Sequence, residues 1–313
     1  MSTAFPRTAA SLRNQEGSGL MKTVIGLALA LGLILTTAPN THAADGKLSV
    51  VAAENFYGDV ARQIGGDDVT VASIMSNPDQ DPHLFETTPT TVRQIAAAQV
   101  VILNGADYDS WMDKLLKASP KPGRTAIVVA DLVRKKAGDN PHLWYDPGTM
   151  PAAAKALAEA FAKADPAHKD GYAARLKTFL ASLKPINEKI AAIRDKFAGT
   201  TVTASEPVFG YMANALDLKM RNERLQLSIM NDTEPSAHDV AAFQDDLKGH
   251  KVRVMFYNKQ ASNKAVQTLV DLAHASKIPV VGVTETAPPN LSYQEWMLGE
   301  LNDTAKALAG PPS

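Results

Sequence analysis

Cysteine is absent from the 313 residues of this sequence. Its absence excludes disulfides, thiolate metal sites, a cysteine nucleophile and the cysteine that carries the lipid of a bacterial lipoprotein. The sequence also has no excess of either charge, since its formal net charge is −1 at pH 7. The charge therefore gives no indication of a nucleic-acid or anionic membrane partner. Any metal site in the chain must therefore use nitrogen and oxygen ligands.

Long hydrophobic runs are missing too, apart from one apolar stretch at residues 24–35. This stretch is too short to cross a bilayer, which needs roughly 20 residues. Met21 and Lys22 precede it, and a small-x-small motif that ends at Ala43 follows it, as in a secretory signal peptide. We expect residues 1–43 to be a signal peptide cleaved after Ala43, with Met21 as an alternative start. A buried core helix and an uncleaved anchor are the other interpretations.

Short apolar runs alternate with helix-period segments in both halves of the remaining chain. This alternation is typical of βαβ units that build a parallel sheet. The expected strands are residues 48–53, 69–74, 100–103, 125–129, 200–204, 252–257 and 279–283.

The middle of the chain, residues 151–197, has an almost unbroken helical pattern, which Pro185 should kink or interrupt. The sequence therefore predicts an α/β protein with two Rossmann-like lobes, whose mostly parallel sheets are joined by one long helix. The expected division is an N-terminal lobe at 44–168, a linking helix at 169–198 and a C-terminal lobe at 199–313.

Two segments that follow expected strands share the pattern Asx-Pro-His-Leu-aromatic. They are DPHLF at residues 81–85 and NPHLW at residues 140–144. Proline fixes its own φ angle and favours an extended conformation for the preceding residue. A stiff, non-helical backbone suits a histidine that acts as a metal ligand or as a catalytic base. Because the pattern occurs twice, we expect His83 and His142 to lie on two sides of a single site.

Two glutamates also follow expected strands. Glu206 comes after the strand at 200–204, and Glu285 after the strand at 279–283. Ligands of open α/β sheets bind beyond the carboxyl ends of the strands, so these carboxylates and the two imidazoles can enclose a divalent cation. Two simpler interpretations stay open, since Glu206 could cap a helix and Glu285 could be a solvated loop charge.

The other polar and aromatic residues near these loops have supporting roles in this interpretation. Side chains that could orient the imidazoles are Asp81, Asp146, Asn258 and Gln260. Aromatic residues expected to pack rather than to do chemistry are Phe85, Trp144 and Trp296. Histidines expected at the surface are His168, His238, His250 and His274.

The chain resembles the periplasmic or surface solute-binding proteins of zinc and manganese ABC transporters. The resemblance covers residues 48–308, and its strongest parts are residues 81–89 and 140–147, which are similar to the two histidine-bearing loops of that family. It implies two α/β lobes joined by one long rigid helix, with the metal between the lobes. It also implies four metal ligands: His83, His142, Glu206 and Glu285.

The chain departs from the family pattern at three points, two of which concern the identity of the metal. Zinc-dedicated members often have a third histidine where this chain has Glu206, and they often carry a histidine-rich loop that residues 121–140 lack. Glu285 stands where aspartate is common. Glu206 and the missing loop favour manganese, whereas the Irving–Williams order favours zinc for the same ligands. Carboxylates that each give one oxygen suit tetrahedral zinc, and carboxylates that bind through both oxygens suit manganese. The number of oxygens that each glutamate gives therefore decides which of the two metals fits the site better.

The sequence thus predicts a monomeric periplasmic protein that captures Zn²⁺ or Mn²⁺ with high affinity and delivers it to an inner-membrane ABC permease. It is not expected to be an enzyme. One alternative is an exported metallohydrolase, although the sequence has no H-E-x-x-H or G-x-S-x-G motif. The other is a binding protein of the same architecture for an organic solute, although no arginine clamp follows the expected strands.

Overall fold

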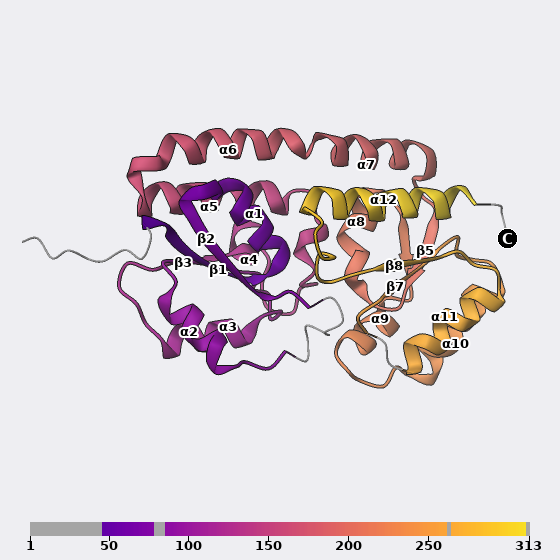
Figure 1. Cartoon of the computed structure of the whole chain (residues 1–313). Coiled ribbons are helices and arrows are strands. Elements are labelled where there is room, and N and C mark those ends of the chain that lie inside the picture. The colour runs from indigo at the N-terminus through magenta and orange to yellow at the C-terminus, as the bar shows by residue number, and fades with distance from the viewer. Residues whose placement is uncertain (1–45, 78–84, 262–263, 311–313) are drawn as a thin grey trace, which may run out of the picture. The chain divides into compact units, whose positions relative to one another are not determined.

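Two parallel four-stranded sheets form the framework of the structure, as the strand pattern predicts (Figure 1). The computed structural model describes residues 46–77, 85–261 and 264–310. The predicted signal peptide, Asp81 and His83 lie outside these described residues. Ala43–Ser313 form one compact unit.

The first sheet has the strand order β2-β1-β3-β4 and the second has the order β6-β5-β7-β8, with every pair parallel. The strands of the first sheet are β1 (Leu48–Glu54), β2 (Val69–Met75), β3 (Val100–Leu103) and β4 (Thr125–Val128). Those of the second are β5 (Thr201–Ala204), β6 (Lys219–Arg221), β7 (Met255–Asn258) and β8 (Val280–Val283). Parallel pairing brings the carboxyl ends of all strands of a sheet to one edge, where ligands of such sheets bind.

The helices begin and end at residues whose local chemistry explains the boundary. Thr88 and Ser292 form capping boxes at the starts of α2 and α12. Gly66, with φ of 57°, ends α1. The helices beside the sheets are α1 (Asn55–Gly65), α2 (Pro89–Ala97), α3 (Ser110–Ala118), α4 (Val129–Leu132), α5 (Thr149–Ala164), α8 (Gly210–Ala215), α9 (Glu223–Met230), α10 (Ala237–Lys248), α11 (Lys264–Ala275) and α12 (Tyr293–Ala309).

The segment that joins the two halves consists of two consecutive helices, α6 (Lys169–Ser182) and α7 (Lys184–Phe197), and not of one continuous helix (Figure 1). Pro185 has no N–H to continue the helical ladder, so the helix is interrupted at Leu183, which nevertheless keeps a helical φ of −79°. Helix α6 packs on α1 and α5, and α7 packs on α12. The division into 44–168, 169–198 and 199–313 stays a prediction.

An aromatic cluster connects the loop that bears His142 to both halves. The Trp144 ring lies 4.7 Å from that of Phe56 in α1, and the Tyr145 ring lies 5.8 Å from that of Trp296 in α12. Both tryptophans are buried, as predicted, and Phe85 packs against Trp111. Such aromatic pairs contribute about 0.5–1.5 kcal/mol each beyond the area they bury. One hydrophobic core therefore runs through both halves.

No helix in the described part of the chain combines the length and the hydrophobicity that crossing a membrane requires.

Three carboxyl groups are buried near strand ends: Glu54 is the last residue of β1, Asp109 accepts the N–H of Asn104 after β3, and Glu300 accepts the N–H of Thr284 after β8. Burial, together with the neighbouring Asp109 carboxylate, raises the pKa of Glu54 well above its usual value. Burial likewise raises the pKa of Asp109 to about 6 and that of Glu300 to about 7. Each of these groups binds a proton more tightly in the folded chain than in the unfolded chain. Their contribution to stability is therefore complete at acid pH and is lost as the pH rises through the folded pKa values.

Replacement of Glu54 by Gln should remove the part of this loss that Glu54 causes, because an amide stays neutral at every pH. Without metal, we expect the Glu54→Gln variant to be more stable than the wild type near pH 7 by about 1–3 kcal/mol, the usual cost of a buried polar group that lacks full compensation. Near pH 4 the difference should vanish. Urea unfolding followed by circular dichroism at both pH values measures it. Glu188→Gln, at an exposed position, is the control; equal pH dependence of Glu54→Gln and wild type would contradict this account.

Candidate metal centre

The structure brings His142, in the loop that follows β4 and α4, next to Glu285, which lies just beyond β8 of the other sheet. Nε2 of His142 lies 3.4 Å from Oε2 of Glu285, and both side chains are fully buried. Pro141 helps to fix the histidine loop, because its carbonyl accepts a hydrogen bond from Nδ2 of Asn104, at 2.8 Å, directly beyond β3. The prediction that these two residues share a site is consistent with this arrangement.

Asn140 determines which nitrogen of His142 faces the site. Nδ2 of Asn140 donates to the carbonyl of Pro207 at 2.8 Å, so Oδ1 is the acceptor that lies 2.7 Å from Nδ1 of His142. Nδ1 must then carry the proton, which leaves Nε2 with the lone pair that a metal requires. Asn140 therefore prepares the imidazole for ligation and also connects its loop to the segment after Glu206.

Glu285 is held by hydrogen bonds on several sides. Oε1 accepts a hydrogen bond from Nδ2 of Asn258 at 2.6 Å, and Oε2 accepts one from the hydroxyl of Tyr108 at 3.0 Å. The backbone N–H of Glu285 donates to Oε1 of Gln260 at 2.6 Å. The interpretation of Glu285 as a solvated loop charge is wrong, since the residue is 0% exposed.

Glu206 directly follows β5 and is 3% exposed. Its Oε2 accepts a hydrogen bond from Nδ2 of Asn258 at 3.2 Å. Glu206 is the residue before a short 3₁₀ turn, Pro207–Phe209, but its side chain makes no capping hydrogen bond there. The interpretation of Glu206 as a helix cap is therefore wrong, and its carboxylate is directed to the same amide that holds Glu285.

The complete set of four ligands stays a prediction, because His83 lies outside the described residues. Within residues 46–77, 85–261 and 264–310, no three histidine, aspartate or glutamate side chains converge closely enough to hold a metal by themselves. What the structure does contain is a buried imidazole–carboxylate pair, with a second carboxylate linked to it through Asn258. Nitrogen and oxygen donors of this kind suit a divalent transition metal.

The supporting residues differ in part from the prediction. Asn258 and Gln260 belong to the site but contact the two glutamates rather than an imidazole. Asp146 accepts the N–H of Gly148. Sequence reasoning missed Asn140, although it begins the second Pro-His segment, and it missed Tyr108, for which the sequence carries no local signal.

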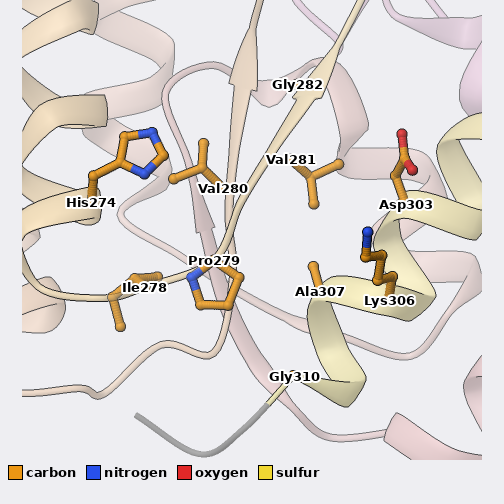
Figure 2. Close-up of a pocket in the computed structure, with 10 residues that line it drawn as sticks. All are labelled: His274, Ile278, Pro279, Val280, Val281, Gly282, Asp303, Lys306, Ala307 and Gly310. Atoms are coloured by element: carbon orange, nitrogen blue, oxygen red, sulfur yellow. The ribbon is translucent and has the colours of Figure 1, made fainter.

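The histidines predicted at the surface are exposed: His168, His238, His250 and His274. One of them, His274, lines a pocket of about 490 Å³ beside β8 and the end of α12 (Figure 2). The described lining of this pocket includes neither His142, Glu206 nor Glu285. The pocket is therefore separate from the candidate metal centre.

The fold is that of known metal-binding proteins of the periplasm. The periplasmic zinc-binding protein TroA from Treponema pallidum matches with a TM-score of 0.73 at 19% identity, over 85% of this chain and 100% of that one. A manganese-bound periplasmic metal-binding protein from Candidatus Liberibacter asiaticus matches with a TM-score of 0.68 at 18% identity, over 84% of this chain and 100% of that one. These likenesses show a common architecture.

The sequence places the chain in a particular family. Residues 50–307 match the profile of the zinc-uptake complex component A periplasmic (ZnuA) family, and the chain belongs to this family. Among curated relatives, the metal ABC transporter substrate-binding lipoprotein SloC of Streptococcus mutans is 25% identical, over 89% of this chain and 95% of the relative. The manganese-binding lipoprotein MntA of Bacillus subtilis is 27% identical, over 81% of this chain and 84% of the relative.

Asn140→Ala should weaken metal binding although Asn140 is not expected to touch the metal. The change removes the acceptor that keeps the proton on Nδ1 of His142, and loss of such a partner typically costs 10- to 100-fold in affinity. Calorimetry with Zn²⁺ and with Mn²⁺ measures the effect. Asn187→Ala, at an exposed position, should bind as the wild type does. Unchanged affinity of Asn140→Ala for both metals would show that Asn140 does not control the tautomer.

Proposed function

We propose that this protein captures a divalent transition metal outside the cytoplasm and delivers it to the permease of an ABC importer. The observation that carries the proposal is the buried approach of His142 Nε2 to Glu285 Oε2 at 3.4 Å, between a loop beyond the first sheet and a loop beyond the second. Membership of the ZnuA family and relatives named as metal ABC transporter substrate-binding proteins support it. Both favour a binding protein over a metallohydrolase or an organic-solute receptor.

The proposed ligands are His83, His142, Glu206 and Glu285. The first two supply imidazole nitrogens, and the last two supply carboxylate oxygens that compensate the charge of the cation. Related proteins are named for manganese, zinc or iron, and all three ions accept such ligands. We propose Zn²⁺ or Mn²⁺ as the transported ion. Because a protonated imidazole cannot bind metal, the affinity should fall as the solution becomes more acidic.

The proposed location is the periplasm, after cleavage of the signal peptide behind Ala43. The relatives SloC and MntA are named as lipoproteins. The 313 residues of this chain contain no cysteine, so none of them can carry a thioether-linked lipid. We propose that the protein acts there as a monomer that meets its permease by diffusion.

Single substitutions at the proposed ligands should remove the metal response of the protein. For the wild type, saturating Zn²⁺ or Mn²⁺ should raise the thermal midpoint, since a ligand at 100 times its dissociation constant adds about 2.7 kcal/mol to stability. We expect His142→Ala and His83→Ala to abolish this shift and Glu206→Gln to reduce it strongly. Differential scanning fluorimetry after treatment with a chelator provides the measurement.

The matched control for these variants is His274→Ala, because His274 is exposed and lies apart from the candidate centre. Its midpoint should shift with metal as the wild-type midpoint does. A wild-type midpoint that responds to small organic solutes but not to either metal would contradict the proposed function.

A further inference from the structure

A chain of three oxygen atoms connects the loop of His142 to the loop of Glu285. Tyr145 lies three positions after His142, and Thr284 directly precedes Glu285. The hydroxyl oxygen (Oη) of Tyr145 lies 2.8 Å from the carbonyl oxygen of Thr284 and 2.6 Å from Oε2 of Glu300, in α12. The chain therefore runs from a buried carboxyl group of the helix to the residue before a proposed metal ligand.

The two contacts of Tyr145 need more hydrogens than its hydroxyl has. A phenol carries one hydrogen, and a backbone carbonyl carries none. The contact with the carbonyl of Thr284 therefore uses the hydrogen of Tyr145, and the contact with Oε2 needs a hydrogen from Glu300. A carboxylate at this position would leave two acceptor oxygens facing each other without a hydrogen between them, which is unfavourable for buried groups.

The other oxygen of Glu300 has the partners expected of the carbonyl oxygen of a carboxylic acid. Oε1 accepts hydrogen bonds from Nε1 of Trp296 at 2.9 Å and from the backbone N–H of Thr284 at 3.3 Å. Both partners are donors, so the hydrogen of the acid belongs on Oε2. A glutamine side chain can reproduce this pattern, because it has one accepting oxygen and one donating NH₂ group.

Burial favours the protonated forms of both side chains. It raises the pKa of Glu300 to about 7, against the lowering effects of the hydrogen bonds and of the Lys259 ammonium group beyond β7. Glu300 is therefore largely protonated at pH 6. Burial and the charge of Glu300 also raise the pKa of Tyr145 well above its usual value, and Glu285 adds to this effect. Tyr145 thus keeps its hydrogen.

The elements packed on α12 contribute few further ionisable groups. Helices α1 and α7 both pack on α12. From α1, Asp59 accepts the backbone N–H of Tyr293, which begins α12. The buried side chains of α7 are all isoleucines: Ile186, Ile190 and Ile193. Lys259 is therefore the cation whose charge opposes the proton of Glu300.

We propose that Glu300 acts as a carboxylic acid that positions the two ligand loops of the candidate metal centre. It donates its hydrogen to Oη of Tyr145, and the hydrogen of Tyr145 then holds the carbonyl of Thr284. This chain maintains the spacing of His142 and Glu285 before the metal arrives. The inference rests on the proposed function, and it assigns a positioning role to a residue that does not touch the metal.

Glu300→Gln and Tyr145→Phe distinguish this role from that of a buried negative charge. Dissociation constants for Zn²⁺ and Mn²⁺ are measured at pH 6 by competition with a chelator of known affinity. Glu300→Gln should bind both metals within about threefold of the wild type, because its amide donates as the acid does. Tyr145→Phe loses the chain and should bind more than about threefold more weakly, the effect of one hydrogen bond. Any other combination of the two results would overturn the inference.

Thr304→Val is the matched control for Tyr145→Phe. It removes another buried hydroxyl of α12, one that donates to the backbone carbonyl of Glu300 at 2.8 Å and does not belong to the chain. Its metal affinity should equal that of the wild type. An equal loss in Thr304→Val and Tyr145→Phe would show that any lost buried hydrogen bond weakens the centre, which would also overturn the inference.

Infrared spectroscopy of the metal-free protein tests the proton itself. At pH 6 the wild type should show a carboxylic-acid C=O band that Glu300→Gln lacks, and this difference should fade as the pH rises through about 7. Asp303→Asn, at an exposed position of α12, should retain the band. Absence of the difference at pH 6 would overturn the inference but leave the proposed function intact. A wild type that binds neither metal at neutral pH would instead contradict the proposed function, so the two failures can be told apart.

Discussion

The arrangement of the candidate centre depends on the burial of two carboxylates at the ends of parallel strands. Glu206 and Glu285 are 3% and 0% exposed, and a buried carboxylate is costly unless hydrogen bonds or an opposite charge compensate it. The donors described for them are the amide of Asn258 and the hydroxyl of Tyr108. These groups carry no permanent positive charge. The proposed divalent cation would supply this charge and so offset the cost of burying the two carboxylates.

Contacts between the two halves keep these groups in place. The Asn55 side chain exchanges two hydrogen bonds with the backbone of Ala287, at 2.7 and 3.0 Å, two residues beyond Glu285. The hydroxyl of Tyr293 donates to the carbonyl of Trp144 at 2.9 Å. Because a continuous hydrophobic core accompanies these bonds, metal capture should involve small local movements rather than a wide closure of two independent domains.

The elements with strong local signals could be predicted from the sequence. The strands β1, β3 and β8 consist of valine-rich runs, and the starts of α2 and α12 carry capping residues. The strand β6 escaped prediction because it has only three residues, two of them exposed. The interruption at Leu183 could be anticipated from Pro185, although its position could not be fixed to the residue.

The site could be predicted only as far as its residues belong to local motifs. His142 is part of a proline-stiffened segment, and Glu206 and Glu285 follow recognisable strands. Tyr108, in contrast, contacts Glu285, which lies 177 positions away in the sequence. No local sequence pattern predicts a contact between residues so far apart. The bond pattern of Asn258 depends on β7 lying between β5 and β8, which is a property of the strand order. The hydrogen bonds that hold the two carboxylates therefore emerge only in the folded chain.

Anomalous diffraction from crystals of the zinc-loaded protein, recorded on both sides of the zinc absorption edge, tests the central claim most directly. The account predicts one strong peak within bonding distance of Nε2 of His142 and of oxygens from both Glu206 and Glu285. A peak at another place, such as the exposed histidines, or a bound zinc that contacts residues of only one sheet, would contradict it.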